Sequence, residues 1–302
     1  MTLISRLLSA VLAITLAACG PAASPPAAAR VAQEDHPALW KLADEDTTIY
    51  LFGTIHVLPA GYEWRDAAID AAIDRSDALV IEAVIDRTDP AKAFALLSRL
   101  GTTPGLPPLL DRVPADKREQ LAALIARSRL PQPFLDGMET WSGALMLMPV
   151  LMSDLGLDGG MGVEEQLEAR FKADGRPIEG LETAEQQLRV LDGLPEDVQR
   201  QFLVAMIDDG TAQKAEFDAM LAAWSRGDEA AIAATFDKDV RVSPELRAAL
   251  LVRRNAAWAD WLKARLDRPG TIFVAVGAGH LAGPDSVVRM LEAKGLKVER
   301  VQ

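Results

Sequence analysis

Two strand-like segments joined by a helix-like segment constrain the fold of this chain more than any other feature. Residues 47–53 (TTIYLFG) are β-branched and aromatic and end in glycine, which is typical of a strand. Residues 77–82 (DALVIE) have the composition of a buried strand that ends in a carboxylate. Between them, residues 64–76 carry apolar side chains at helical spacing: Ala67, Ala68, Ala71, Ala72 and Ile73. This order predicts a parallel pair of strands with a right-handed crossover.

The rest of the chain predicts a second unit of the same kind after a long helical stretch. Residues 271–276 (TIFVAV) form the clearest strand, followed by a helix over 285–294 and a last strand over 297–301. Prolines interrupt a helical pattern over 90–172, and 176–182 is a weaker strand candidate followed by helices over 184–266. We therefore predict an α/β fold, in which N- and C-terminal βαβ units build a central, mostly parallel sheet around a helical insertion at about 88–172.

The N-terminus has the layout of an export signal. Arg6 precedes an apolar run over 7–18 that is too short for a comfortable membrane span. Residues 16–19 (LAAC) resemble the lipobox of bacterial lipoproteins, in which the signal is cut before the cysteine and the thiol receives a lipid. We predict a lipoprotein signal peptide over 1–18 and a lipid on Cys19; the alternatives are an ordinary signal peptide and an uncleaved anchor. Gly20, in place of aspartate, favours the outer membrane, with the protein facing the periplasm.

Composition limits the partners and the source of stability. Residues 19–37 are rich in small residues and proline and predict a flexible tether. Cys19 is the only cysteine, so no disulfide is possible and one packed domain over 38–302 must supply the stability. The net charge is −12 and there is no basic stripe, which argues against a nucleic-acid partner.

Two of the three histidines share a motif and a location. His56 ends GTIH and His280 ends GAGH, and both GxxH motifs directly follow a predicted strand. Glu82 and Glu182 end two further strand candidates. Ligands of open parallel sheets bind beyond the carboxyl ends of the strands. If these strands are parallel, the four side chains converge and form a site for Zn, Mn, Co or Fe(II).

Other common catalytic motifs are absent. The chain has no HExxH helix, no P-loop and no GxSxG elbow. The segment GAGHLAG at 277–283 has its third glycine one residue too late for a dinucleotide loop, and only one further strand follows it.

Five segments together resemble the TraB/GumN family, over roughly residue 38 to the C-terminus. They are, in order, 50–57 (YLFGTIHV), 80–82 (VIE), 180–183 (GLET), 254–255 (RN) and 276–281 (VGAGHL). The Tiki proteins, described as metalloproteases that act on Wnt ligands, belong to the same superfamily. The resemblance implies a metal-dependent hydrolase fold related to the erythromycin-esterase and ChaN-like group.

Carried over position by position, the resemblance makes His56, Glu82 and His280 candidate metal ligands or catalytic residues. It makes Arg254 and Asn255 polar site residues delivered by a helix. One position departs from the family pattern: the usual Gly-x-Asp before GLET is here Gly-Val-Glu, ending at Glu164. Its carboxylate reaches one methylene further, which bears on whether this member is active.

These observations lead to one preferred function and two alternatives. The preferred function is a metal-dependent hydrolase, in its specific form a peptidase, with an unknown peptide or small-molecule substrate. In this hypothesis Glu182 or Glu164 is the general base and Arg254 stabilises developing negative charge. The alternatives are a non-catalytic lipoprotein that binds haem or metal through the same histidines, and a non-catalytic regulatory lipoprotein.

Methionines in the helical insertion leave a further question open. Met146, Met148, Met152 and Met161 lie near Trp141 in the sequence. They either fill gaps in the core or line a groove for a partner or substrate.

Overall fold

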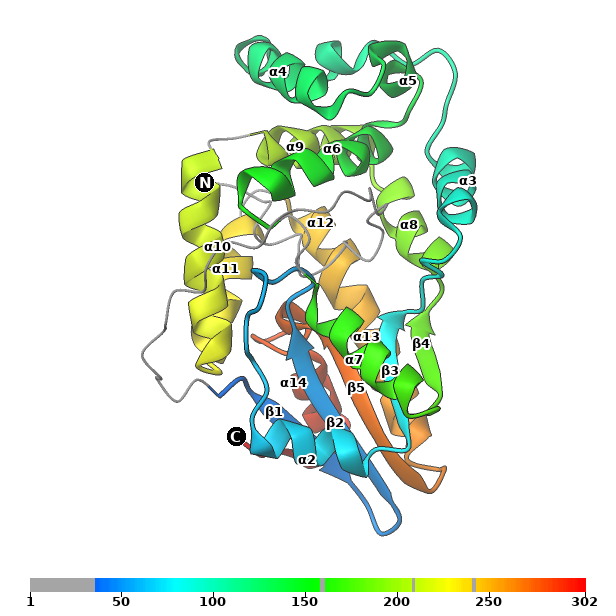
Figure 1. The fold of residues 1–302 in the computed structure, drawn as a ribbon, viewed down its shortest axis with the longest axis vertical. Helices are drawn as coiled ribbons and strands as arrows, with labels where there is room; N and C mark the ends of the chain where they lie inside the picture. Colours follow the sequence, from blue (N-terminus) through cyan, green and yellow to red (C-terminus); the bar gives the residue numbers. More distant parts are fainter. Residues whose placement is uncertain (1–35, 158–160, 208–209, 241–242) are drawn as a thin grey trace.

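A mostly parallel sheet forms the base of the structure (Figure 1). The computed structural model describes residues 36–157, 161–207, 210–240 and 243–302. Within these ranges the strands form one six-stranded sheet in the order β4-β3-β5-β2-β1-β6. The strands are β1 (Leu39–Ala43), β2 (Thr47–Thr54), β3 (Ala78–Ala83), β4 (Ile178–Glu182), β5 (Gly270–Gly277) and β6 (Val298–Arg300). The α/β fold with a mostly parallel central sheet is therefore confirmed.

The pairing of the first two predicted strands differs from the expectation. β2 and β3 are parallel and joined through α2 (Ala67–Arg75), but β5 lies between them. Leu51 of β2 and Val80 of β3 both lie opposite Val274. The continuously apolar β5 takes this position because a central strand of a parallel sheet is buried on both faces.

One edge of the sheet is antiparallel. Its strand β1 lies between β2 and β6 and was not predicted from the sequence. β1 pairs antiparallel with β2, and β6 pairs antiparallel with β1. β6 therefore runs in the same direction as β5, as a C-terminal βαβ unit requires, but two strands separate them.

Each face of the sheet is covered by its own pair of helices (Figure 1). Tyr50 and Phe52 of β2 point to the face packed by α2 and α7 (Val163–Ala173). Ile49 and Leu51 point to the opposite face, packed by α13 (Arg253–Arg265) and α14 (Val287–Ala293). This alternation follows from the period-two geometry of a strand.

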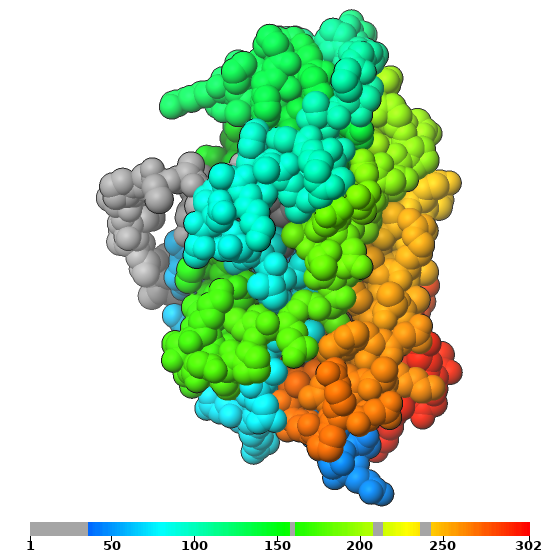
Figure 2. All heavy atoms as spheres, turned by 90° about the vertical axis from the view of Figure 1, so that its right-hand side faces the viewer, coloured from blue at the N-terminus to red at the C-terminus, as the bar shows by residue number. Residues whose placement is uncertain are grey.

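The remaining helices stack beyond the carboxyl ends of the parallel strands (Figure 1). On one side of the molecule α3 and α8 lie next to each other (Figure 2). The helices of this layer are α3 (Pro90–Leu100), α4 (Arg118–Ser128), α5 (Gln132–Asp136), α6 (Thr140–Asp154), α8 (Ala184–Asp192), α9 (Glu196–Met206), α10 (Gly210–Ser225), α11 (Glu229–Val240) and α12 (Pro244–Arg247). Short turns are η1 (Leu109–Arg112), η2 (Ala115–Lys117), η3 (Ala248–Val252) and η4 (Ala278–His280).

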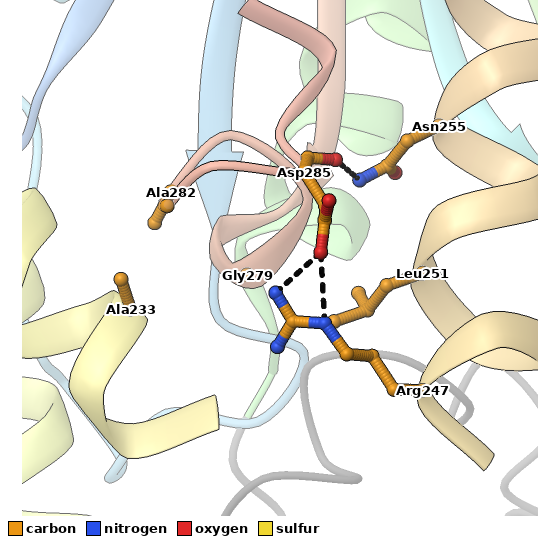
Figure 3. A pocket seen from close by; sticks show the side chains of 8 residues that line it. Ala233, Arg247, Leu251, Asn255, Gly279, Ala282 and Asp285 are labelled. Atoms are coloured by element: carbon orange, nitrogen blue, oxygen red, sulfur yellow. Dashed lines mark hydrogen bonds and ion pairs between the residues drawn. The ribbon is translucent and has the colours of Figure 1, made fainter. Parts of the chain in front are cut away.

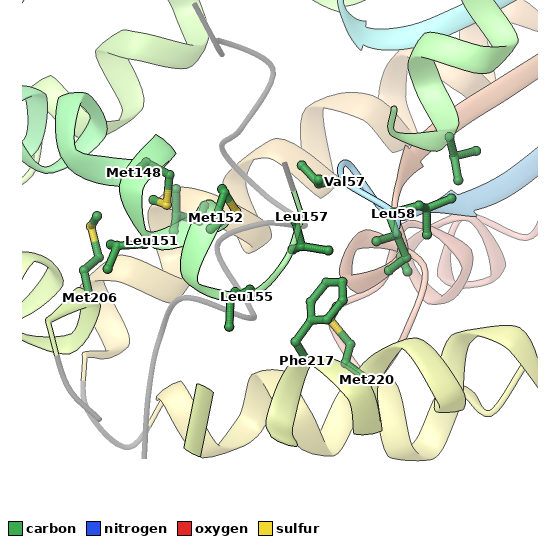
Figure 4. Close-up of a cluster of buried hydrophobic side chains, with 14 of the residues drawn as sticks. Val57, Leu58, Met148, Leu151, Met152, Leu155, Leu157, Met206, Phe217 and Met220 are labelled. Atoms are coloured by element: carbon green, nitrogen blue, oxygen red, sulfur yellow. The ribbon is translucent and has the colours of Figure 1, made fainter. Parts of the chain in front are cut away.

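The methionine segment belongs mainly to the core. Met148 and Met152 of α6 are buried in a cluster with leucines and with Phe217 and Met220 of α10 (Figure 4). Met161, by contrast, is 54% exposed. Of the two alternatives, filling of the core is therefore confirmed for Met148 and Met152. Met161 lies at the surface.

The export-signal residues 1–18 and Cys19 lie outside the described residues, so their predicted roles stay predictions. Among the described residues, no helix is both long and apolar enough to cross a bilayer.

Candidate active site

The carboxyl ends of four neighbouring parallel strands bring the predicted site residues together. His56 follows β2, Glu82 lies near the end of β3, and His280 ends the η4 turn after β5. Nε2 of His56 lies 3.9 Å from Oε1 of Glu82, and Nε2 of His280 lies 3.7 Å from the same oxygen. The side chains of all three residues are buried. Two histidines more than 200 positions apart in the sequence thus face one carboxylate oxygen.

The hydrogen bonds of Asn255 determine the tautomer of His280. Nδ2 of Asn255 donates to the carbonyl oxygen of Asp285 at 2.7 Å. Its Oδ1 therefore faces His280, and Nδ1 of His280 donates to it at 2.5 Å. Burial and the nearby charges of Arg254 and His56 lower the pKa of His280 well below its usual value. His280 is thus a neutral imidazole whose Nε2 lone pair faces Glu82 and Arg254.

Glu164 holds the ring of His56 through Nδ1, as Asn255 holds the ring of His280. Its Oε1 accepts hydrogen bonds from Nδ1 of His56 and from the hydroxyl of Thr54. Burial alone would raise the pKa of Glu164, but the charge of His56 and these hydrogen bonds outweigh it and lower the pKa. Both imidazoles are therefore held through Nδ1 by a side-chain oxygen and present Nε2 to Glu82.

The start of α7 explains how Glu164 reaches His56. Val163 N–H donates to the carbonyl oxygen of Ile55 at 3.0 Å, which brings the helix against the GxxH loop. A Cβ on Gly162 would lie 1.9 Å from the carbonyl oxygen of His56, so only glycine allows this approach. Within the Gly-Val-Glu segment, Gly162 thus allows close backbone contact with His56, and Glu164 supplies the carboxylate that bonds to its ring.

Arg254 crosses the site and binds both strand-end carboxylates. Nη2 donates to Oε2 of Glu82 at 2.6 Å, and Nε donates to Oε1 of Glu182 at 3.0 Å. Nη1 lies 3.2 Å from Nε2 of His280. The residue is 5% exposed, and although burial lowers its pKa, the two carboxylates outweigh burial and raise it. Arg254 is therefore a buried, permanently charged group beside the two histidines.

Arg254 and Asn255 lie in the first turn of α13, directly after a wide helical turn. The π-helical turn η3 directly precedes α13, and Nη1 of Arg254 donates to Leu250 within it at 3.2 Å. Such turns are rare and are frequent at functional sites. The helical periodicity of the sequence does not reveal this turn.

Glu182 is tied to Arg254 and not to a histidine. Its Oε1 accepts from Nε of Arg254 and also from Nε1 of Trp258, at 3.0 Å each. Trp258 in turn packs on the ring of His280, with centroids 4.4 Å apart. The structure therefore places Glu182 at the outer edge of the cluster.

Gln187 belongs to the site, and the sequence analysis missed it. The capping box of Thr183 and Gln186 starts α8 directly after β4, so Gln187 lies one turn into the helix. Its Nε2 donates to Oε2 of Glu82 at 3.3 Å. The only sequence signal was its position shortly after Glu182.

The donor set of this cluster fits a divalent metal. Two imidazole Nε2 atoms and a carboxylate oxygen are ligand types that suit Zn, Mn, Co or Fe(II). Two carboxylates, of Glu82 and Glu182, bond to the guanidinium of Arg254, while the carboxylate of Glu164 faces His56. Among the described residues, however, no three His, Cys, Asp or Glu side chains are close enough to enclose an ion. Metal binding to Nε2 of His280 would replace the contact of this atom with Nη1 of Arg254.

Two pockets border the histidine loops. One, of about 340 Å³, is lined by residues 59–65, Met161 and Gln166, and so adjoins the loop after His56 and the start of α7. The other, of about 10 Å³, is lined by Asn255, Gly279 and Asp285 among others, and has room for about one water molecule. There Asp285 accepts from Arg247 and Asn255, which ties the loop after His280 to α12 and α13 (Figure 3).

Comparison with known proteins agrees with this arrangement of motifs. The sequence profile of the TraB/PrgY/gumN family matches residues 38–300. The chain belongs to this family. Among its relatives is YbaP of Escherichia coli (strain K12), described as uncharacterized, at 26% identity over 80% of this chain and 87% of that protein. An uncharacterized protein of Treponema pallidum (strain Nichols) is 25% identical over 85% of this chain and 80% of its own length. No solved structure matches the chain.

Proposed function

We propose that the chain is a metal-dependent hydrolase of the bacterial envelope that cleaves amide bonds, as a peptidase does. One observation carries the proposal. Each buried imidazole is held through Nδ1 by a side-chain oxygen, while both Nε2 atoms face Oε1 of Glu82. Histidines that bind metals donate their other ring N–H to such oxygens, which sets the tautomer and the ring orientation.

The proposal assigns a role to each residue of the cluster. His56, His280 and Glu82 would hold the metal, and Glu164 and Asn255 would orient the two imidazoles. When bound, the metal would polarise a carbonyl and lower the pKa of a water towards neutrality.

Arg254 would stabilise negative charge that develops on the substrate oxygen. Glu182 accepts from Arg254 and Trp258, so we assign it to positioning the guanidinium rather than to the general-base role expected from the sequence. Glu164 accepts from the Nδ1 edge of His56, which faces away from Glu82, so it supports the ring rather than an attacking water.

We also propose that the lipid on Cys19 holds the domain at the membrane. A lipid anchor at this position, followed by the residues up to 37, would keep the domain near the bilayer while leaving it free to turn. This part of the proposal rests on the sequence alone.

The metal content of the purified full chain tests the proposal. We expect about one Mn, Zn, Co or Fe per chain by mass spectrometry after dialysis against each metal, and less than about a tenth of that in His56→Ala and His280→Ala. His36→Ala is the matched control, because His36 is half exposed and bonds to Asp66, outside the cluster. Absence of every metal from the folded wild-type protein would refute the hydrolase proposal. A haem absorption band that both site variants lose would favour the haem-binding alternative.

A further inference from the structure

We propose that the free edge of β4 binds an extended peptide, which adds to the sheet as a further strand and places a large apolar residue beside Gly180. The inference rests on the proposed function only in calling this peptide a substrate, and neither its observations nor its test involve a metal. β4 stands at one end of the strand order, so only one of its two edges is paired. It lies on the right-hand side of the sheet in Figure 1, the side that faces the viewer in Figure 2.

The register with β3 determines which backbone groups of β4 point outward. Leu79 N–H donates to the carbonyl oxygen of Pro177 at 3.0 Å, and Leu79 lies opposite Ile178. Alternate residues of a parallel strand bond to the same neighbour, so Pro177 and Glu179 turn their bonding groups to β3. The N–H and C=O groups of Ile178 and Gly180 therefore point away from the sheet. Neither residue bonds to the backbone of any described segment outside the sheet.

The backbone at Gly180 is open to solvent. Gly180 is exposed, and because glycine has no side chain, this exposure is that of its backbone. The unpaired N–H and C=O groups of an edge strand are a template for another chain. The short length of β4 and the exposed charge of Glu179 oppose permanent association of such edges. Reversible addition of a peptide strand suits an edge of this kind.

An apolar residue beside this edge indicates the chemistry of the peptide. Val84, which directly follows β3, is 44% exposed although it is apolar. A Cβ on Gly180 would lie 3.2 Å from the backbone nitrogen of Val84, so the two residues are neighbours. A glycine on an edge strand leaves part of the sheet face uncovered, and an aromatic side chain on the adjoining strand can cover it. We therefore expect a phenylalanine or a similar residue of the peptide to lie beside Gly180 and Val84.

The end of β4 leads such a peptide to the histidine cluster. β4 ends at Glu182, whose Oε1 accepts from Nε of Arg254 at 3.0 Å. A peptide along β4 would therefore reach the outer edge of the cluster with its amide groups held in register by the sheet. A second copy of the chain is a poorer occupant of this edge, because two chains of net charge −12 repel each other.

N-methylated peptides test the pairing. The probe is the dye-labelled peptide Lys-Thr-Val-Thr-Phe-Thr-Val-Lys, and its affinity for the full chain would be measured by fluorescence anisotropy with chelator present. Only alternate N–H groups of an added strand face the edge. Methylation of one set of nitrogens, either those of Val and Phe or those of Thr, should thus weaken binding by about tenfold or more, and methylation of the other set by no more than about twofold. Equal effects of both sets, or no binding of the parent peptide, would overturn the inference.

Two exposed valines locate the binding. Val84→Ser should weaken binding of the parent peptide by about fivefold, because less apolar surface would be buried beside the phenylalanine. Val301→Ser is the matched control, because Val301 is 46% exposed and lies next to β6 at the opposite edge of the sheet. Equal losses in the two variants would overturn the inference.

Two further outcomes separate this inference from its alternatives. A dimer in sedimentation of the chain alone, dissociated by the peptide, would show that a second copy occupies the edge and would overturn the inference. Absence of metal from the folded chain would refute the hydrolase proposal, whereas peptide binding with alternate sensitivity to methylation would still support the docking edge.

Discussion

Each histidine of the site is held by a side chain that bonds to Nδ1, while Nε2 of the ring faces Glu82. Glu164 accepts from Nδ1 of His56, and Asn255 accepts from Nδ1 of His280. Neither support contacts Glu82, so their effect on a bound metal would pass through the rings. A metal site loses about 10- to 100-fold in affinity when such a supporting residue is removed.

Replacement of Glu164 tests this support. We expect Glu164→Leu to lower the affinity for the preferred metal by about 10- to 100-fold, measured by competition with a chelator of known affinity. Glu164→Asp restores the usual family residue and keeps the carboxylate, so its affinity should lie much closer to that of the wild type. An unchanged affinity in Glu164→Leu would contradict the orienting role.

Arg254 is expected to dominate the stability of the metal-free site. Its removal leaves Glu82 and Glu182 buried without their shared guanidinium, which costs about 3–5 kcal/mol when a buried pair is broken. Urea unfolding of Arg254→Met should show this loss. Arg99→Met is a matched control, because Arg99 is 56% exposed and Glu185, which it bonds, is 39% exposed, and such a pair contributes about 1 kcal/mol at most. A loss in Arg254→Met no larger than in the control would contradict the prediction.

The lowered pKa of His280 predicts a pH dependence of folding. In the unfolded chain this histidine binds a proton below about pH 6.5, whereas in the folded protein it stays neutral to well below that pH. The unfolded state therefore binds more protons, and stability falls as the pH drops below about 6.5, by up to about 1.4 kcal/mol per pH unit.

Comparison with a variant isolates this contribution. Urea unfolding of metal-free protein, with chelator present, should show a steeper loss of stability between about pH 6.5 and 5 in the wild type than in His280→Gln. The two proteins differ only at residue 280, so the difference between their slopes reports on this histidine. Equal slopes of unfolding free energy against pH in the two proteins would show that His280 takes up its proton in the folded state.

At the scale of elements, the contact between α7 and the loop of His56 decides whether the site can form. The helix begins where the backbone of Gly162 touches the backbone of His56, and Val163 N–H bonds to Ile55. Glu164 follows within the first turn of this helix. A shift of α7 would therefore move the carboxylate away from the imidazole.

Replacement of Gly162 tests this contact. Gly162→Ala should destabilise the fold by about 1–3 kcal/mol and weaken metal binding, because the new methyl group displaces α7 from His56. Gly137→Ala is the matched control: its Cβ would meet nothing closer than 3.6 Å, and its backbone is right-handed helical. We expect the control to stay within about 0.5 kcal/mol of the wild type or to gain stability. Equal effects in urea unfolding would rule out a special role for the contact.

At the scale of the whole molecule, the predicted lipid on Cys19 would hold the domain at a membrane. We expect the wild-type chain to sediment with membranes after cell lysis and to require detergent for release, since the proposed lipid chains would hold it there. Cys19→Ala should remove the lipid and shift most of the chain to the supernatant. Retention of Cys19→Ala in the membrane fraction would favour an uncleaved signal anchor instead.

The local patterns of the sequence were enough for the parallel strands, the α/β class and the identity of the main site residues. Strand composition is a local property, and a residue that follows such a strand must lie at the carboxyl edge of a parallel sheet. His56, Glu82, Glu182 and His280 were found in this way. Arg254, Asn255 and Glu164 were found through resemblance to the family.

The tertiary structure alone decided which strands are neighbours and which side chains meet. The sequence predicts β5 as a strand, but its position between β2 and β3 depends on packing. The short β1 is held by its pairing with β2 and β6, which no local pattern indicates. The contact of Arg254 with both carboxylates joins residues more than 70 and 170 positions apart, and Gln187 reaches Glu82 across 105 positions. Such contacts depend on how the elements pack, because the sequence records the chemistry of each side chain but not its distance from the others.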